Sequence, residues 1–217
     1  DDVRNNPLRP EERDSFGYDL AQLQYIRALG ADSDMTASVY YQRGYGWYRL
    51  FDFGTDVLRQ YGLDGMLLGT IVTYEHRAGA FTTNYGLHVN RFRRDHTRDD
   101  LSIGARDYAN DGVKGEANAF VKVSYDAGRW NLYGDAQLRH STFDYNGDVD
   151  VDSIDWTFFN PKIGARYALS SISTIYASAG TTTREPTRND LFQGEDNASF
   201  AHDLREVRPE RVIDLEA

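Results

Sequence analysis

The sequence contains no cysteine. It can therefore form neither a disulfide framework nor a thiolate metal site. It also lacks any run of about 18 apolar residues, which a transmembrane helix would require. With a net charge of −10, no basic excess is left to neutralise phosphates, so we expect no nucleic-acid partner. Disulfide-rich, helical-membrane and nucleic-acid-binding classes are thus excluded, and β-rich folds remain open.

Alternation of apolar and polar residues is the main pattern present. In RWNLYGDAQLRH (129–140), Trp130, Leu132 and Leu138 alternate with polar residues, which is typical of a β-strand with one apolar face. The same period recurs in 35–42, 81–90, 117–125 and 159–167, and less cleanly in 16–29, 66–76 and 173–182. Because 209–217 resembles the start of a further strand, the pattern predicts about nine strands, the ninth unfinished.

The connections between the predicted strands alternate in length. Short connections rich in Gly, Ser and Asp, which tolerate tight turns, fall at 30–33, 77–80, 126–129 and 169–172. Long loops are predicted at 45–64, 93–116, 144–157 and 183–208. All the tight turns therefore lie at one end of a row of hairpins, as in outer-membrane barrels.

Aromatic residues of the apolar faces gather near the tight turns, at Tyr74, Phe81, Tyr125, Trp130 and Tyr167. Aromatic rings favour the boundary between membrane and water. We therefore predict an all-β fold, an antiparallel up-and-down transmembrane β-barrel whose apolar faces meet lipid. The polar residues predicted to face the lumen are Asn84, His88, Asn118, Lys122, Asp135, Gln137, Arg139, Lys162 and Arg166.

The last third of the sequence carries a combination of short motifs. A predicted strand contains Tyr-Ala-Ser (176–178), and a loop motif, a strand-start motif and Asp-Leu-Glu (214–216) follow it. The combination resembles a late part of the barrel of TonB-dependent outer-membrane receptors, as do NPLRPEERDSF (6–16) and FFNPKIGARY (158–167). The residues of the loop and strand-start motifs are Arg184, Glu185, Pro186, Thr187, Arg188, Asn189, Pro209, Glu210 and Arg211.

The resemblance implies a 22-stranded barrel in the Gram-negative outer membrane, with a plug in its lumen. Residues 1–217 would then be a partial barrel domain of eight to nine strands, without the plug domain and its TonB box. The implied function is energy-coupled uptake of a scarce nutrient, most commonly an iron–siderophore complex. The implied partners are the receptor's own plug, the TonB complex acting through the plug, outer-membrane lipid and a small ligand such as a ferric siderophore.

No enzymatic activity, catalytic residue or cofactor is predicted, because neither a Gly-x-Ser-x-Gly elbow nor a P-loop is present. A site for the transported ligand is expected in loops on the rigid barrel. One candidate is the aromatic-rich stretch 44–62, whose stacking and cationic groups are Tyr45, Trp47, Tyr48, Arg49 and Phe51. Packing of this loop on its neighbours is the alternative. The second candidate is 184–206, whereas 90–100 interleaves Arg with Asp and suggests self-neutralising ion pairs.

Acidic residues gather in DYNGDVDVDSID (144–155), and alternate oxygen ligands suit calcium. Val149 stands where a calcium loop of the EF-hand type needs glycine, so we predict a solvated acidic loop. The five histidines show no metal-ligand spacing, and no metal site is predicted.

Two other folds remain open from the sequence. One is a self-contained eight-stranded outer-membrane barrel, an adhesin or a small lipid-modifying enzyme. The other is a soluble β-sandwich that binds a ligand through its long loops.

Overall fold

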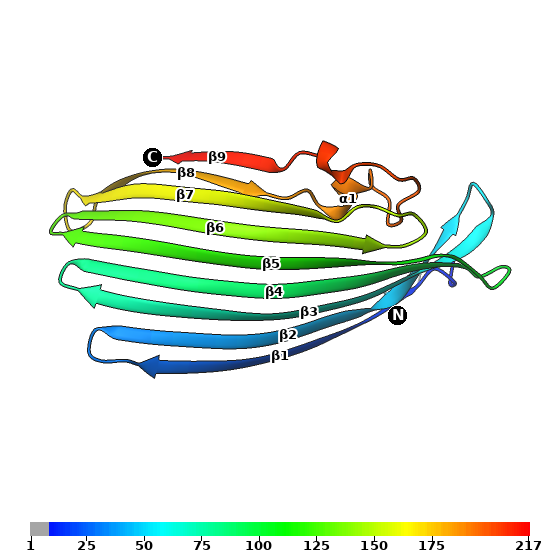
Figure 1. Ribbon diagram of the computed structural model, residues 1–217, viewed down its shortest axis with the longest axis horizontal. Helices are drawn as coiled ribbons and strands as arrows, with labels where there is room; N and C mark the ends of the chain where they lie inside the picture. The colour runs from blue at the N-terminus through cyan, green and yellow to red at the C-terminus, as the bar shows by residue number, and fades with distance from the viewer. Residues whose placement is uncertain (1–8) are drawn as a thin grey trace.

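The computed structural model describes residues 9–217, which form one antiparallel sheet (Figure 1). Residues 6–8 of the stretch 6–16 lie outside this described part. Its strands pair in sequence order, which confirms the prediction of about nine strands. They are β1 (Asp14–Ala28), β2 (Ser33–Asp52), β3 (Val57–Ala78), β4 (Phe81–Asp100), β5 (Ala105–Ala127), β6 (Trp130–Asn146), β7 (Ile154–Ala168), β8 (Thr174–Arg184) and β9 (Glu210–Glu216).

Two short helical elements, α1 (Arg188–Leu191) and the 3-10 turn η1 (Leu204–Glu206), lie between β8 and β9. Within residues 9–217, no helix has the length and apolar character needed to cross a membrane.

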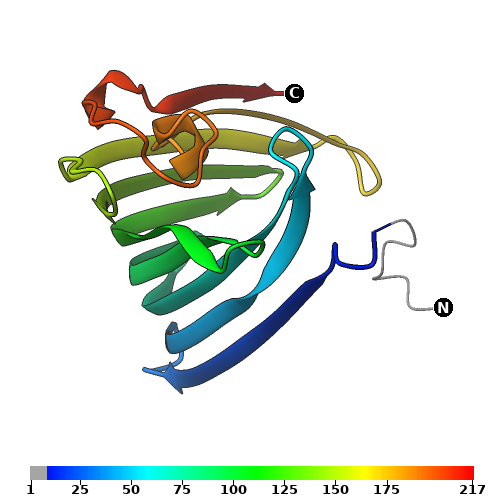
Figure 2. The same ribbon diagram turned by 90° about the vertical axis from the view of Figure 1, so that its right-hand side faces the viewer.

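The sheet is curved, and the segment of residues 185–207, here called the 185–207 segment, lies against its concave face (Figure 2). Directly paired residues on neighbouring strands share a face of a sheet. Arg139 pairs with Asn118 on β5 and Phe158 on β7, so these three side chains share one face. Phe158 packs against the 185–207 segment, which identifies that face as the concave one.

The convex face carries exposed apolar side chains at the positions that the alternation predicts, among them Val39, Leu68, Leu87, Leu132, Leu138, Phe159 and Ile163. Beside the tight turns, aromatic rings pair across strands. The ring centroids of Phe81 and Tyr125, and those of Trp130 and Tyr167, lie 4.6 Å apart. An apolar face bordered by such rings is suited to lipid.

The four predicted short connections are confirmed. β1 and β2, β3 and β4, β5 and β6, and β7 and β8 are joined by 29–32, 79–80, 128–129 and 169–173. Gly79 and Gly128 adopt φ angles of 59° and 65°, a left-handed conformation that glycine accepts without steric cost.

Three of the four predicted long loops are shorter than predicted, because strands continue through most of 45–64 and 93–116 and through half of 144–157. The connections at that end shrink to 53–56, 101–104 and 147–153, and only the one between β8 and β9 is long. The charged residues there form ion pairs between neighbouring strands, such as Arg43–Asp64 at 2.7 Å and Arg106–Asp99 at 2.7 Å. Opposite charges on adjacent strands are compatible with continued pairing of the backbone.

The sheet topology excludes both alternative folds. A β-sandwich requires two sheets packed face to face, whereas residues 9–217 form a single sheet. A self-contained eight-stranded barrel requires β1 to pair with β8, but β8 pairs with β7 and β9. β1 and β9 are the two edges of an open sheet.

Candidate functional site: a cavity under the 185–207 segment

The 185–207 segment begins with a locally specified helix start. Thr187 is the N-cap of α1, and its hydroxyl accepts a hydrogen bond from the backbone N–H of Asp190 at 3.3 Å. The Asp190 carboxylate in turn accepts from the backbone N–H of Thr187 at 2.8 Å. This reciprocal capping box needs an acidic residue three positions after Thr187, and Asp190 provides it directly after the motif.

Apolar side chains anchor the segment to the concave face of β7. The segment and β7 form one buried apolar cluster. The segment contributes Leu191, Phe192, Ala198 and Leu204, and β7 contributes Ile154, Trp156 and Phe158. Burying one Leu or Phe side chain contributes about 1.5–3 kcal/mol, so the cluster is a substantial part of the attachment.

Glu185 provides a buried ionic anchor beside this cluster, with 7% of the residue exposed. Its carboxylate accepts hydrogen bonds from Arg139 at 2.7 and 2.9 Å and forms an ion pair with Lys114. Burial alone would raise the pKa of Glu185, but the hydrogen bonds from Lys114 and Arg139 lower it to about 2. The Glu185 carboxylate is therefore held ionised.

The network continues along the wall from Arg139. Its guanidinium also donates to Glu116 at 2.6 Å, and Glu116 accepts from the Asn118 amide at 3.2 Å. The same amide contacts His88 Nδ1 at 3.2 Å, and His88 Nε2 lies 2.6 Å from the Tyr40 hydroxyl. Polar groups of β2, β4, β5 and β6 thus satisfy one another on the concave face.

Arg188 fixes the part of the segment around Asp196. Its guanidinium donates to the Asn110 side chain on β5 and to the backbone carbonyl of Asp196 at 2.6 Å. Asn110 donates to the same carbonyl at 3.0 Å and to Asn197 at 2.9 Å. Asn197 also accepts from the Tyr145 hydroxyl at 2.8 Å. These hydrogen bonds therefore attach the backbone around Asp196 to side chains of β5 and β6.

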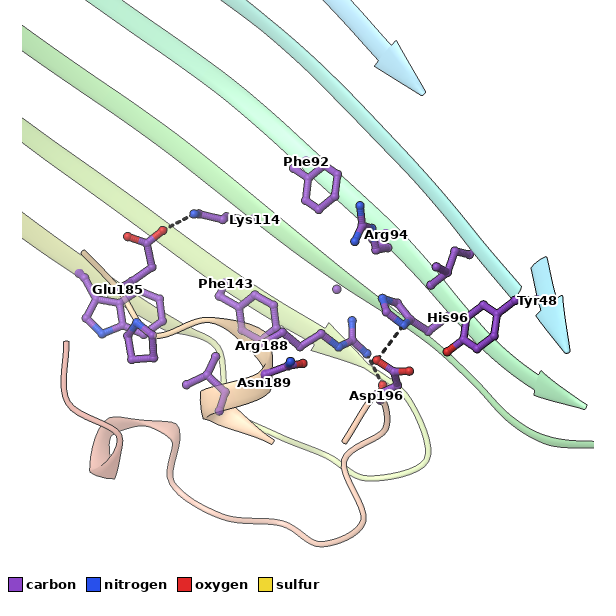
Figure 3. Close-up of a pocket in the computed structure, with 15 residues that line it drawn as sticks. Tyr48, Phe92, Arg94, His96, Lys114, Phe143, Glu185, Arg188, Asn189 and Asp196 are labelled. Atoms are coloured by element: carbon purple, nitrogen blue, oxygen red, sulfur yellow. Dashed lines mark hydrogen bonds and ion pairs between the residues drawn. The ribbon is translucent and has the colours of Figure 1, made fainter. Parts of the chain in front are cut away.

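A cavity of about 390 Å³ lies between the segment and the wall (Figure 3). Its apolar lining comprises Leu63, Phe92, Phe143, Trp156, Pro186 and Leu191. Besides the paired Lys114 and Glu185, its polar lining comprises Tyr48, Arg94, His96, Arg188, Asn189 and Asp196. The cavity therefore offers apolar surface and several cations to one occupant.

The electrostatics of the cavity differ between its two carboxylates. Glu185 is neutralised by its two cations, whereas Asp196 has a weaker contact, His96 Nδ1 at 3.4 Å. The pKa of the Asp196 carboxyl is lowered, first by the His96 ring and further by Arg188 and Arg94. Arg94 makes no hydrogen bond or ion pair with residues 9–217, and its guanidinium lies 5.0 Å from the centre of the Phe92 ring.

All the residues predicted to face the lumen lie on the concave face. The register places them in rows with Arg139 and Phe158, and the set is Asn84, His88, Asn118, Lys122, Asp135, Gln137, Arg139, Lys162 and Arg166. Only His88, Asn118 and Arg139 of this set belong to the network attached to the segment.

The predicted ligand-contacting stretch 44–62 consists of the paired ends of β2 and β3, joined by the short connection 53–56. The strand alternation therefore divides its candidates between two faces. Tyr48 lines the cavity, with its ring stacked 4.9 Å from that of Tyr61. Tyr45, Trp47, Arg49 and Phe51 occupy the alternate positions of β2, on the opposite face.

The family-motif residues have structural partners. Arg184, the last residue of β8, donates to Glu210, the first residue of β9, at 2.6 Å. Pro209 directly precedes β9 and Arg211 lies within it, opposite Thr183. Arg184 and Glu210 thus join the two ends of the connection between β8 and β9. The remaining loop-motif residues, Glu185, Pro186, Thr187, Arg188 and Asn189, lie within this connection.

Among the acidic residues of the stretch 144–155, Asp148 contacts the segment, because its carboxylate accepts a hydrogen bond from the Asn197 amide at 3.2 Å. Within residues 9–217, no group of three or more His, Cys, Asp or Glu side chains is arranged to hold a metal ion.

Several cavity residues are not singled out by the sequence. Arg94 and His96 lie in the stretch interpreted as self-neutralising ion pairs, and Lys114 lies in a predicted loop. Their signal is the same alternation that identifies His88 and Asn118, extended to Arg94 and His96 along β4 and to Lys114 along β5.

The apolar convex face and the polar concave face are those of the wall of an outer-membrane β-barrel. Residues 1–217 match the family described as TonB dependent receptor-like, beta-barrel. The chain belongs to this family, whose members are receptors and transporters of the Gram-negative outer membrane and not enzymes. The predicted family, fold class and localisation are confirmed.

Solved structures of similar fold include the copper transporter OprC, with a TM-score of 0.78 and 18% identity over 94% of this chain and 36% of that chain. The unliganded ferric citrate transporter FecA gives a TM-score of 0.70 and 12% identity over 80% of this chain and 28% of that chain. The ferric yersiniabactin uptake receptor FyuA of Yersinia pestis gives a TM-score of 0.66 and 11% identity over 80% of this chain and 29% of that chain.

These identities establish a likeness of fold. The chain spans about a third of the length of these solved structures. No curated protein matches it.

Proposed function

We propose that this chain is part of the barrel wall of a receptor that carries an iron–siderophore complex across the outer membrane in a TonB-dependent step. On this proposal, residues 1–217 are a partial barrel domain, and the plug domain with its TonB box belongs to the same receptor. The remaining partners are the TonB complex, outer-membrane lipid and the ferric complex itself.

The observation that carries the proposal is the cavity under the 185–207 segment. Ferric iron is bound by anionic oxygen ligands, so its chelates commonly carry negative charge. Arg94 and Arg188 line the cavity without a carboxylate in direct contact, and Phe92, Phe143 and Trp156 give it aromatic surface. A negatively charged chelate with apolar groups matches this combination.

The polar concave face supports the assignment of a plug. Lys122, Asp135, Lys162 and Asp214 occupy one row across the sheet, which passes through Gly180 of β8, and Lys162 and Asp214 approach within 3.6 Å. A row of charges facing an enclosed space suits a polar partner surface that fills the lumen.

The test is iron uptake by the natural host. We would delete the gene, complement it with the wild type, and measure ⁵⁵Fe accumulation from a panel of ferric chelates under iron limitation, each with and without an intact TonB complex. Uptake of at least one chelate is expected to require both the gene and the TonB complex. Unchanged uptake of every chelate in the deletion strain, or loss of copper uptake instead, would contradict the proposal.

A further inference from the structure

At three residues of the cavity, nitrogen atoms lack a hydrogen-bond partner within residues 9–217. His96 is 6% exposed, and its Nε2 has no hydrogen-bond partner. The Nε of Arg188 is buried and likewise unpartnered, although the other nitrogens of this group bind Asn110 and the carbonyl of Asp196. The Arg94 guanidinium, on the same strand as His96 and two residues before it, is exposed and unpaired.

Buried polar atoms without partners are uncommon in folded proteins, and each requires an explanation. Arg188 is fixed by its contacts with Asn110 and Asp196, so it cannot turn its Nε toward another acceptor without losing them. Arg94 and His96 occupy alternate positions of β4, so both side chains extend from the concave face toward the cavity (Figure 3). The unsatisfied groups are therefore gathered at one place.

We propose that this part of the cavity is an oxyanion-binding subsite, formed by Arg94, His96 and Arg188, for a carboxylate or phosphate group. The apolar part of the same ligand lies on Leu63, Phe92 and Phe143, which line the cavity beside these three residues. The inference rests on the proposed function where it takes the ligand to be the nutrient. The binding chemistry itself does not depend on transport.

A cation would be the poorer occupant. The Glu185 carboxylate is already saturated by Lys114 and Arg139, so it has no capacity for a further positive partner. The Asp196 carboxylate already contacts His96 Nδ1 at 3.4 Å and has the positive charges of Arg188 and Arg94 near it, which lower the pKa of its carboxyl, so it is already compensated. An oxyanion can instead accept hydrogen bonds from all three unpartnered groups, and charge-assisted hydrogen bonds are the stronger ones.

The experiment uses the full-length gene product in lipid nanodiscs and isothermal titration calorimetry. The probes are 2-naphthoate, 2-naphthyl phosphate and the neutral 2-naphthamide, which share an apolar body and differ in charge. Wild-type protein should bind at least one of the two anions at least tenfold more tightly than the amide, and the comparison of the two anions identifies the preferred oxyanion.

Arg94→Gln should weaken binding of the preferred anion by about tenfold, and Arg94→Glu should weaken it further. Arg93→Gln is the matched control, because Arg93 is the preceding residue of β4, faces the convex side and pairs with Asp95 at 3.0 Å. It should leave the affinity unchanged. Heat-modifiable mobility of each variant verifies that the barrel is folded, and Arg94 has no hydrogen bond or ion pair within residues 9–217 whose loss would unfold it.

Equal affinity for the amide and both anions, no binding of either anion, or the same loss in Arg93→Gln and Arg94→Gln would overturn the subsite. Failure of the subsite is distinct from failure of the proposed function. Wild-type protein that takes up iron but does not bind the anionic probes contradicts only the subsite. Arg94-dependent anion binding without TonB-dependent uptake contradicts only the proposed transport.

Discussion

Glu185→Gln should loosen the 185–207 segment from the wall by about 2–3 kcal/mol. Glutamine retains the shape of the protonated acid but not its charge. The pKa of Glu185 falls from 4.5 to about 2, and at about 1.4 kcal/mol per tenfold change in ionisation constant this difference corresponds to about 3 kcal/mol. Removing one partner of a buried ion pair costs about 3–5 kcal/mol. We expect a loss at the lower end of these values, because Arg139 still forms its ion pair with Glu116 and the Lys114 side chain is 35% exposed to solvent.

Hydrogen exchange of the full-length protein in nanodiscs, followed by mass spectrometry, measures this loss. Local opening governs exchange of the buried amides around Leu191 and Ala198, so their exchange in Glu185→Gln should accelerate by roughly 30- to 150-fold. Glu195→Gln is the control, because it makes the same substitution at an exposed position of the same segment. Unchanged exchange in Glu185→Gln, or equal acceleration in both variants, would refute the assignment of Glu185 as an anchor.

The pH dependence gives a second signature. Because the pKa of Glu185 is lowered by folding, its stabilising contribution is complete above about pH 4.5 and is lost as the pH falls toward about 2. Protection corrected for the intrinsic exchange rate should therefore decrease through this window in the wild type. The part of the decrease due to Glu185 should be absent in Glu185→Gln.

Two further predictions concern the two faces of the sheet. Tyr48→Ala should weaken binding of the transported ligand, measured by calorimetry, whereas Trp47→Ala should not, because only Tyr48 lines the cavity. Equal losses would show that the ligand does not use this cavity. Ile163→Arg, on the lipid-facing side, should destabilise the folded barrel by about 2–4 kcal/mol in urea titrations in vesicles. Lys162→Arg, on the concave face, should have little effect, and a cost as large as that of Ile163→Arg would reverse the assignment of the faces.

Much of the fold could be predicted because its strands carry a period of two within the membrane. Trp130, Leu132 and Leu138 are apolar on one face since that face meets lipid, and the pattern is legible from the residues alone. Beyond the lipid both faces are wet, so the pattern fades although the strands continue. Arg93 and Asp95 there look like loop residues, but they lie on β4, where both pair with residues of β3 and of β5.

The site was less predictable for a related reason. Alternation assigns a residue to a face but does not reveal which distant residue it meets. Arg188 and Asn110 are separated by 78 positions, and they meet only because the 185–207 segment folds back over β5. Tyr48 and Trp47 could have been told apart, however, if the stretch that contains them had been recognised as a strand.

The concave face contains one arginine paired with carboxylates and one without a carboxylate in contact. We expect the first to stabilise the structure and the second to bind the ligand. Arg139 is neutralised by Glu116 and Glu185, so its charge is consumed in holding the segment to the wall. Arg94 has no carboxylate in contact, so removing its charge leaves no group unpaired. Glu185→Gln should therefore alter exchange protection of the segment, whereas Arg94→Gln should alter anion affinity and leave protection unchanged. If Arg94→Gln instead loosened the segment, Arg94 would be a structural cation and the cavity would lose its unpaired charge.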